Sequence, residues 1–103
     1  MLKIDTEFRK GIFFIRLSGK LDNYLKLKSI YDLTLNLGIR YVVLNTSNLL
    51  LLDVSMINYI YKYNDRLIKN NGYLLICDTN NHRKRIFNAI NNINCEIDAF
   101  ALI

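Results

Sequence analysis

Residues 40–45, with the sequence RYVVLN, decide the fold because they form an apolar strand with a helical pattern on either side. Before them, apolar residues recur at about 3.6-residue spacing from Asn23 to Leu37, which predicts an amphipathic helix. After them, Ser55 to Asn70 shows the same period and ends at Asn71-Gly72, a pair that tolerates the left-handed conformation. Tyr73 to Cys77 is a second apolar strand. Strands joined through helices run parallel with right-handed crossovers, so this region predicts the parallel part of an α/β sheet.

The chain opens with two predicted strands and no helical pattern between them. From Leu2 to Phe8, apolar or small residues alternate with charged ones, which predicts a half-buried strand at a sheet edge. Arg9-Lys10-Gly11 forms a short turn, and Ile12 to Leu17 is apolar on both faces, so this second strand is expected nearer the sheet centre. Ser18 to Asp22 is expected to break it. The opening therefore predicts an antiparallel hairpin, which makes the sheet mixed.

The other segments complete the predicted domain. After a loop at Asp78 to Asn81, apolar spacing predicts a third helix whose inward face contains Ile86, Ala89, Ile90 and Ile93. Glu96 to Ile103 fits either an edge strand or a final helical turn. Leu49 to Leu52 fits either a connection under the sheet edge or a short strand extension. The whole pattern predicts one α/β domain over residues 1–103, with a mixed sheet of four to five strands and helices packed on it.

Composition disfavours several classes of protein. Of the 103 residues, 51% are hydrophobic and 22% are charged, which disfavours disorder. The apolar runs Tyr73–Cys77 and Ala99–Ile103 are far shorter than the roughly 18–20 residues that span a bilayer. No basic segment leads into an apolar one, as it would in a signal peptide. We therefore expect no membrane insertion and, with two cysteines, a reducing cytoplasmic location.

The net charge of +5 and the pI of about 9.3 raise the question of nucleic-acid binding. The basic residues are spread along the chain, and only the run from His82 to Arg85 is clustered. A short basic run of this kind is typical of a solvated face. We therefore expect no nucleic-acid partner, although a small basic nucleic-acid-binding protein stays open as an alternative on charge alone.

Motifs for catalysis, cofactors and metals are absent from the sequence. His82 is the only histidine, and no set of Cys, His or carboxylate residues has metal-ligand spacing. There is no C-x-x-C motif and no glycine-rich loop that could cradle a phosphate. No serine has a histidine and an acid suitably placed for a triad. The sequence thus predicts no enzymatic activity, no cofactor and no metal.

The order of short motifs resembles the STAS domains of the anti-sigma factor antagonist family. LSGKLD at 17–22 resembles the family's L-x-G-x-L-D signature, and VVLNTS at 42–47 resembles V-V-L-D-L-S. LDVS at 52–55 stands where the family has I-D-S-S-G before its second helix. NGYLLI at 71–76 resembles the R-G-x-x-L-x-L stretch, and residues 81–87 occupy the opening of its third helix.

This resemblance implies a regulator that works by binding proteins. Members of the family dock onto an anti-sigma factor that is also a serine kinase, and a serine at the start of the second helix accepts the phosphate. A helix N-terminus tolerates a phosphate well, whereas a phosphate inside an interface repels a partner that fitted the bare hydroxyl. Here the acceptor position is Val54, which has no hydroxyl, and Ser55 is the possible phosphorylation site. Met56 replaces the family's glycine, and Asn45 replaces an aspartate. We expect phosphorylation at this helix to be absent or altered.

The predicted partner-binding surface lies at the start of the second helix. Asp22 and Asp53 each follow a strand and precede a helix, so they are expected to cap helices and to rim one surface together with Val54 and Ser55. The inward face of this helix is expected to contain Ile57, Ile60, Tyr61, Asn64, Leu67 and Ile68. That leaves Met56, Tyr59 and Tyr63 on a shoulder, either covering the core edge or contacting the partner.

Three other functions stay open beside the anti-sigma factor antagonist. The chain could be a STAS subunit of a larger assembly, such as a stressosome-like or lipid-transport complex. It could also be the small nucleic-acid-binding protein named above. A module that binds a small ligand at the apolar end of the sheet is the third.

Overall fold

The computed structural model describes residues 2–21, 24–79, 83 and 85–102. The elements in chain order are β1 (Lys3–Arg9), β2 (Ile12–Leu21), α1 (Tyr24–Asn36), β3 (Tyr41–Leu52), α2 (Val54–Lys69), β4 (Tyr73–Cys77), β5 (Asn91–Ile93), the 3-10 helix η1 (Glu96–Asp98) and α3 (Ala99–Leu102). Within these residues the strands form one five-stranded sheet in the order β1-β2-β3-β4-β5. β1 pairs antiparallel with β2, and the other pairs are parallel. The predicted mixed α/β sheet is confirmed.

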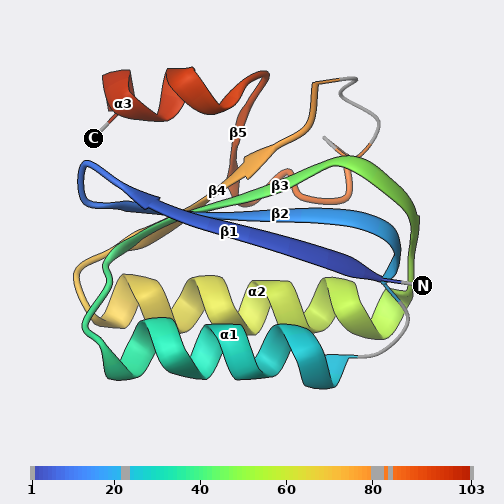
Figure 1. Cartoon of the computed structure of the whole chain (residues 1–103), viewed down its shortest axis with the longest axis horizontal. Helices are drawn as coiled ribbons and strands as arrows, with labels where there is room; N and C mark the ends of the chain where they lie inside the picture. Colours follow the sequence, from blue (N-terminus) through green and yellow to red (C-terminus); the bar gives the residue numbers. More distant parts are fainter. Residues whose placement is uncertain (1, 22–23, 80–82, 84, 103) are drawn as a thin grey trace.

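The helices lie in layers on the two faces of the sheet. α1 and α2 cover one face side by side, whereas α3 lies over the opposite face (Figure 1). The crossovers through α1 and α2 step across the sheet in the same direction, so right-handed connections place both helices on one face. The core has two parts as a result. The larger part lies under α1 and α2, and in the smaller one Phe14, Val43 and Leu75 pack with Ala99 near the C-terminus.

The predicted hairpin at the start of the chain is confirmed. Arg9 pairs with Ile12, so Lys10 and Gly11 alone make the turn, with φ angles of 51° and 83°. Positive φ at both positions is the geometry of a type I′ turn, which matches the twist of the flanking strands. β1 lies at the sheet edge as expected, but its side chains are almost all exposed, including Phe8.

The expected break at Ser18–Asp22 is wrong, because β2 continues to Leu21. Leu49–Leu52 belongs to β3, which settles the open alternative in favour of a strand extension. β4 ends at Cys77, opposite Asn45, so the later residues of β3 pair with β2 alone. The register between β2 and β3 shifts twice along this ribbon. Backbone pairing with β3 therefore outweighs the local turn signal of the glycine and polar residues.

The predicted third helix is also wrong within the described residues. Residues 83 and 85–90 form turns, in which the amide of Phe87 donates to the carbonyl of Arg83 at 3.0 Å. The side-chain amide of Asn92 then donates to the carbonyls of Phe87 and Ile90, and the chain enters β5. Ile90 is buried as expected, but Ile86 and Ala89 are exposed, Phe87 is buried instead, and Ile93 lies in β5. The tail is helical, which settles the second open alternative.

The inward face of α2 is rotated from the predicted one. Its buried residues are Met56, Ile60, Tyr63, Asn64 and Leu67, whereas Ile57 and Tyr61 are half-buried and Ile68 is exposed. The rotation has a simple cause: α2 packs against α1 as well as against the sheet.

None of the described helices is long and apolar enough to cross a bilayer.

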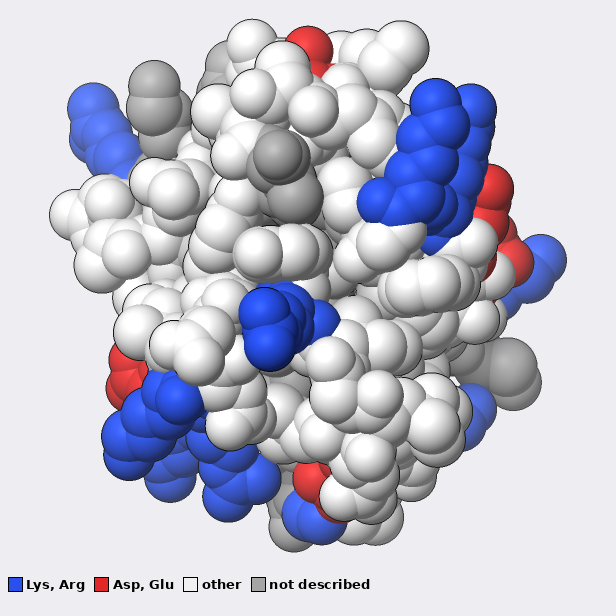
Figure 2. All heavy atoms as spheres, turned by 90° about the vertical axis from the view of Figure 1, so that its left-hand side faces the viewer, with Lys and Arg blue, Asp and Glu red and all other residues white. Residues whose placement is uncertain are grey.

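Charge is distributed unevenly over the surface. Figure 2 shows the end of the molecule where the β1–β2 turn and the last turns of α1 and α2 lie, which is the left-hand side of Figure 1. Lysine and arginine side chains are scattered among uncharged residues over this face, also near its centre, and acidic atoms are visible toward its margins.

Candidate functional site

The start of α2 is held in place by Asp53. This residue has extended backbone angles of φ −70° and ψ 147°, and its Oδ1 accepts from the amide of Ser55 at 3.1 Å. Its own amide donates to the carbonyl of Leu21 at 3.1 Å, which ties the helix start to the end of β2. The predicted N-cap is confirmed. Val54 and Ser55 therefore occupy the first turn of the helix, where free amide groups and the positive end of the dipole lie.

Three apolar side chains are exposed beside this helix start. Leu50 is 79% exposed, Leu51 50% and Val54 71%. Both leucines lie in the part of β3 that continues past the end of β4 and pairs with β2. Leu50 also lies at a register shift, unpaired between Leu49 and Leu51. Three exposed large apolar side chains within a span of five residues are typical of an interaction site.

A shallow groove of about 330 Å³ adjoins the same helix turn, and it is lined by Ser55, Met56, Asn58, Tyr59 and Lys62. Tyr59 is half-buried, and its ring stacks on that of Tyr31 with 5.4 Å between centroids. This contact fixes the tyrosine ring without burying it fully. Tyr59 is thus on the shoulder of α2, as the sequence predicted.

Met56 and Tyr63 are not on that shoulder, so their predicted placement is wrong. Met56 is 3% exposed and Tyr63 2%. The ring of Tyr63 stacks on Tyr31 at 3.6 Å between centroids, and its hydroxyl is hydrogen-bonded to Thr34. Burial raises the pKa of Tyr63 well above its ordinary value. The packing of α1 against α2 turns these two side chains inward.

Asp22, predicted to lie at the edge of this surface, falls outside the described residues.

Arg83 has a structural role at the β3 extension. Its guanidinium donates to the carbonyls of Thr46 and Leu49, at 3.2 and 2.6 Å, and its amide donates to Asp78 Oδ2 at 3.0 Å. Arg83 therefore holds the strand extension in place. Two other members of the predicted basic run, His82 and Lys84, are outside the described residues.

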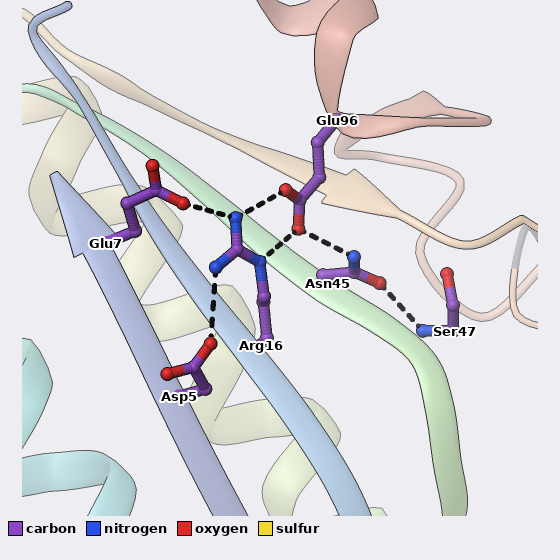
Figure 3. Close-up of polar contacts among 6 residues, drawn as sticks. All are labelled: Asp5, Glu7, Arg16, Asn45, Ser47 and Glu96. Atoms are coloured by element: carbon purple, nitrogen blue, oxygen red, sulfur yellow. Dashed lines mark hydrogen bonds and ion pairs between the residues drawn. The ribbon is translucent and has the colours of Figure 1, made fainter. Parts of the chain in front are cut away.

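A second polar cluster lies on the sheet face opposite α1 and α2 (Figure 3). Arg16 at its centre donates to both carboxylate oxygens of Glu96 at 2.8 Å, to Glu7 at 2.7 Å and to Asp5 at 3.2 Å. Asn45 donates to Glu96 at 2.8 Å and is itself fixed by the amide of Ser47. These hydrogen bonds raise the pKa of Arg16 and lower that of Glu96. The cluster fastens the C-terminal segment to the sheet.

Burial raises the pKa of the Cys77 thiol to about 11, so this cysteine is protonated and unreactive at neutral pH. In the part of the chain that the structure describes, no three His, Cys, Asp or Glu side chains gather as a metal site requires.

Sequence reasoning missed two features of these sites. The pairing of Asp5 with Arg16 follows from the two-residue turn, so hairpin register alone was a sufficient signal for it. Glu96 joins them from 80 residues away, and no local pattern indicates that contact. Leu49 is buried whereas Leu50 and Leu51 are exposed, and a run of four leucines contains no signal that distinguishes them.

Comparison with known proteins supports the fold. No protein-family model matches the sequence. The anti-sigma factor antagonist SpoIIAA in its unphosphorylated form has a similar structure, with a TM-score of 0.81 and 14% identity over 96% of this chain and 94% of that one. An anti-sigma factor antagonist from Mycobacterium paratuberculosis is also similar, with a TM-score of 0.79 and 14% identity over 100% of this chain and 94% of that one.

A STAS domain from Rhodobacter sphaeroides has a similar structure, with a TM-score of 0.54 and 15% identity over 73% of this chain and 84% of that one. At sequence identities this low, the structural similarity is evidence of a shared fold alone. The resemblance seen in the sequence is therefore confirmed in three dimensions: this chain has the fold of the anti-sigma factor antagonists and STAS domains.

Proposed function

We propose that this chain is a non-enzymatic regulator that binds an anti-sigma factor or a related serine-kinase-like protein through the start of α2. The observation that carries the proposal is the exposed apolar group of Leu50, Leu51 and Val54 beside a rigidly capped helix start. The surface continues through Ser55 to Tyr59 along the groove. We further propose that residues 1–103 act as one domain in the cytoplasm.

The surface differs in composition from the one predicted. Met56 and Tyr63 are buried, so Leu50 and Leu51 take their place as the apolar contacts. A few well-packed side chains, most often tryptophan, tyrosine and arginine, supply most of the binding energy of protein–protein interfaces. Tyr59 is suited to such a role because its stacked ring is already ordered and loses little entropy on binding.

Val54 supports a version of this function without a phosphorylation switch. Its exposed isopropyl group stands in the helix turn where the resembled family has its acceptor serine. A permanent apolar group favours partner binding at all times, as expected of a subunit in a lasting assembly. That second candidate, a STAS subunit of a larger complex, uses the same surface.

Nucleic-acid binding is less well supported than protein binding. The guanidinium of Arg83, in the one basic run of the sequence, is taken up by two backbone carbonyls. Contacts with nucleic-acid phosphates require basic side chains that can reach the sugar–phosphate backbone.

Calorimetric titration against a candidate anti-sigma factor tests the proposal. Val54→Asp and Tyr59→Ala are each expected to weaken binding by about 1–3 kcal/mol if these residues are hot spots. Leu37→Ser is the matched control, since Leu37 is as exposed as Val54 but lies at the far end of the molecule. Equal losses for Leu37→Ser and Val54→Asp, or no loss for Val54→Asp, would overturn the proposal.

A further inference from the structure

β1 forms an exposed edge of the sheet, because β2 is its one neighbouring strand among the described residues. Arg9 and Ile12 flank the type I′ turn and form a hydrogen-bonded pair, so every second residue of β1, counted back from Arg9, bonds to β2. The amide and carbonyl groups of Ile4, Thr6 and Phe8 therefore face outward. No hydrogen bond from a described residue reaches these outward groups.

The side chains of β1 divide between the two faces of the sheet by polarity. Leu2 and Phe8 lie on the face that α1 and α2 cover, with Leu2 packed against the larger core and Phe8 60% exposed. Lys3, Asp5 and Glu7 lie on the opposite face, where the two carboxylates belong to the polar cluster in Figure 3. A strand added to this edge would meet apolar side chains on one face and charged side chains on the other.

One antiparallel register of two β1 strands makes these side chains complementary. With the twofold axis at Asp5, Lys3 lies opposite Glu7 of the second copy, and Leu2 lies opposite its Phe8. The axis repeats both pairs, and it also places outward backbone groups opposite outward backbone groups. This register joins opposite charges on one face and covers the exposed phenylalanine ring on the other.

The neighbouring register is unfavourable. With the axis at Thr6, Lys3 lies opposite Arg9 and Asp5 lies opposite Glu7, so every charged pair joins like charges. The axis at Asp5 brings together one like pair, the two Asp5 carboxylates, and each of these is already paired with a guanidinium of its own copy at 3.2 Å. Charged residues commonly protect an edge strand from unspecific pairing. Here they select one partner, which is a second copy of the same strand.

We propose that two copies of this chain form a symmetric dimer by pairing their β1 strands antiparallel about Asp5. The two five-stranded sheets then join into one continuous sheet. Its remaining edges are formed by β5, and a strand of three residues offers little to a further copy, so assembly closes at the dimer. β2 separates β1 from β3, so the candidate docking surface on β3 and α2 lies outside the shared edge.

Sedimentation velocity over a range of protein concentrations tests the dimer. We expect the unaltered chain to shift from monomer to dimer as the concentration rises. Lys3→Glu and Glu7→Lys each place like charges opposite one another at both ends of the paired strands, and each is expected to weaken dimerisation about tenfold. Lys69→Glu makes the same charge change at the exposed end of α2. This matched control is expected to dimerise like the unaltered chain.

Mixing the two charge variants separates an effect on the interface from an effect on the fold. In an equimolar mixture of Lys3→Glu and Glu7→Lys, opposite charges meet again at both ends of the paired strands, so dimerisation is expected to recover. A variant with a damaged fold would not be rescued in this way. Thermal unfolding of each variant measures any loss of stability, including the loss from removing the bond between Glu7 and Arg16.

A disulfide locates the twofold axis. The variants are made with Cys95→Ser, which removes the exposed cysteine and leaves the buried Cys77. Asp5→Cys is expected to give a disulfide-linked dimer under mild oxidation, because residues directly opposite in a non-hydrogen-bonded pair bring their Cβ atoms to about 4.5–5.5 Å. Thr6→Cys is expected to remain unlinked, since it lies opposite Ile4 of the second copy and not opposite itself.

Several outcomes would overturn the proposal. A monomer at all concentrations would mean that the edge does not pair. A dimer that neither charge variant weakens, that Lys69→Glu weakens equally, or that the mixture fails to restore would place the contact elsewhere. A disulfide at position 6 and not at position 5 would rule out the register about Asp5. None of these results depends on whether an anti-sigma factor binds at α2.

Discussion

At the scale of single residues, two buried tyrosines differ in the partners of their hydroxyl groups. Among the described residues the hydroxyl of Tyr31 has no hydrogen-bond partner, whereas that of Tyr63 is bonded to Thr34. The hydroxyl of Thr34 also donates to the carbonyl of Tyr31 at 2.7 Å. Burial raises the pKa of Tyr31 well above its ordinary value, so its hydroxyl stays protonated. The two rings stack on each other, but only the hydroxyl of Tyr63 contributes a hydrogen bond to the stability of the fold.

This difference predicts opposite results for two identical changes. Tyr63→Phe is expected to lower the free energy of unfolding by about 1 kcal/mol, because it removes one buried hydrogen bond. Tyr31→Phe is expected to leave it unchanged or raise it, because no bond is lost and an unpaired polar atom is removed. Urea denaturation of the two variants measures both effects. A larger loss for Tyr31→Phe than for Tyr63→Phe would contradict the assignment.

The first turn of α2 gives a second prediction at this scale. We expect a serine kinase that recognises this helix start to leave position 54 unmodified, because valine has no hydroxyl to phosphorylate. Val54→Ser is expected to restore modification there, since the acceptor would stand at an exposed, capped helix start. Phosphopeptide mapping after incubation with the kinase reads out the site. Modification of Ser55 in the unaltered chain would mean that the acceptor has shifted by one residue.

At the scale of elements, the connections after the helices decide how the parallel strands meet. Gly72 follows α2, and the amide of Tyr73 next to it donates to the carbonyl of Arg40 at 2.9 Å. A Cβ atom at position 72 would lie 1.9 Å from that same carbonyl oxygen. The close approach of β4 to the start of β3 therefore requires glycine at this position.

Two glycine substitutions test this requirement. Gly72→Ala is expected to lower the free energy of unfolding by about 2–4 kcal/mol, because the backbone must move to relieve the clash. Gly38→Ala is the control, since position 38 has a φ of 72° but open space around it, and a cost of about 1 kcal/mol is expected. Thermal or urea unfolding distinguishes the two. Similar costs would show that backbone conformation, and not the contact with Arg40, makes glycine necessary at position 72.

At the scale of the whole molecule, the Arg16 cluster joins the two ends of the chain. Arg16 bonds to Asp5 and Glu7 on β1 and to Glu96 near the C-terminus. The segment after β5 is thereby fastened over the second face of the sheet, where Phe100 packs against Phe14. One guanidinium thus couples the edge strand to the tail.

This coupling predicts a loss of stability in acid. The pKa of Glu96 is lowered by hydrogen bonds from Arg16, so its contribution is complete above the unfolded value of about 4.3 and is lost as the pH falls through the lower folded value. Glu96→Gln is expected to cost about 1 kcal/mol at neutral pH and to flatten the acid dependence. Asp98→Asn, an exposed carboxylate two residues later, is the control. Thermal unfolding across the acid range measures both, and equal flattening by Asp98→Asn would contradict the role of Glu96.

The candidate docking surface was only partly predictable from the sequence. Asp53, Val54 and Ser55 were placed correctly at an exposed helix start, because a capping residue before a periodic segment marks such a start. Met56 and Tyr63 were placed wrongly, because periodicity does not reveal how far a second helix widens the buried face. Leu50 and Leu51 could not be recognised as surface residues, since they belong to a run of four leucines in which Leu49 is buried.

The sequence by itself determined the hairpin, the two long helices, the apolar strands between them and the ends of α2, since local periodicity, turn residues and crossover handedness are properties of short segments. Within the described residues, the tertiary structure alone decided three things: the extension of β2 and β3, the rotation of α2, and the presence of turns and β5 where a third helix was predicted. Each depends on hydrogen bonds or packing between segments far apart in the chain. A strand continues where a partner strand is available, and a helix face is buried where a neighbour covers it, and neither condition is written in the segment itself.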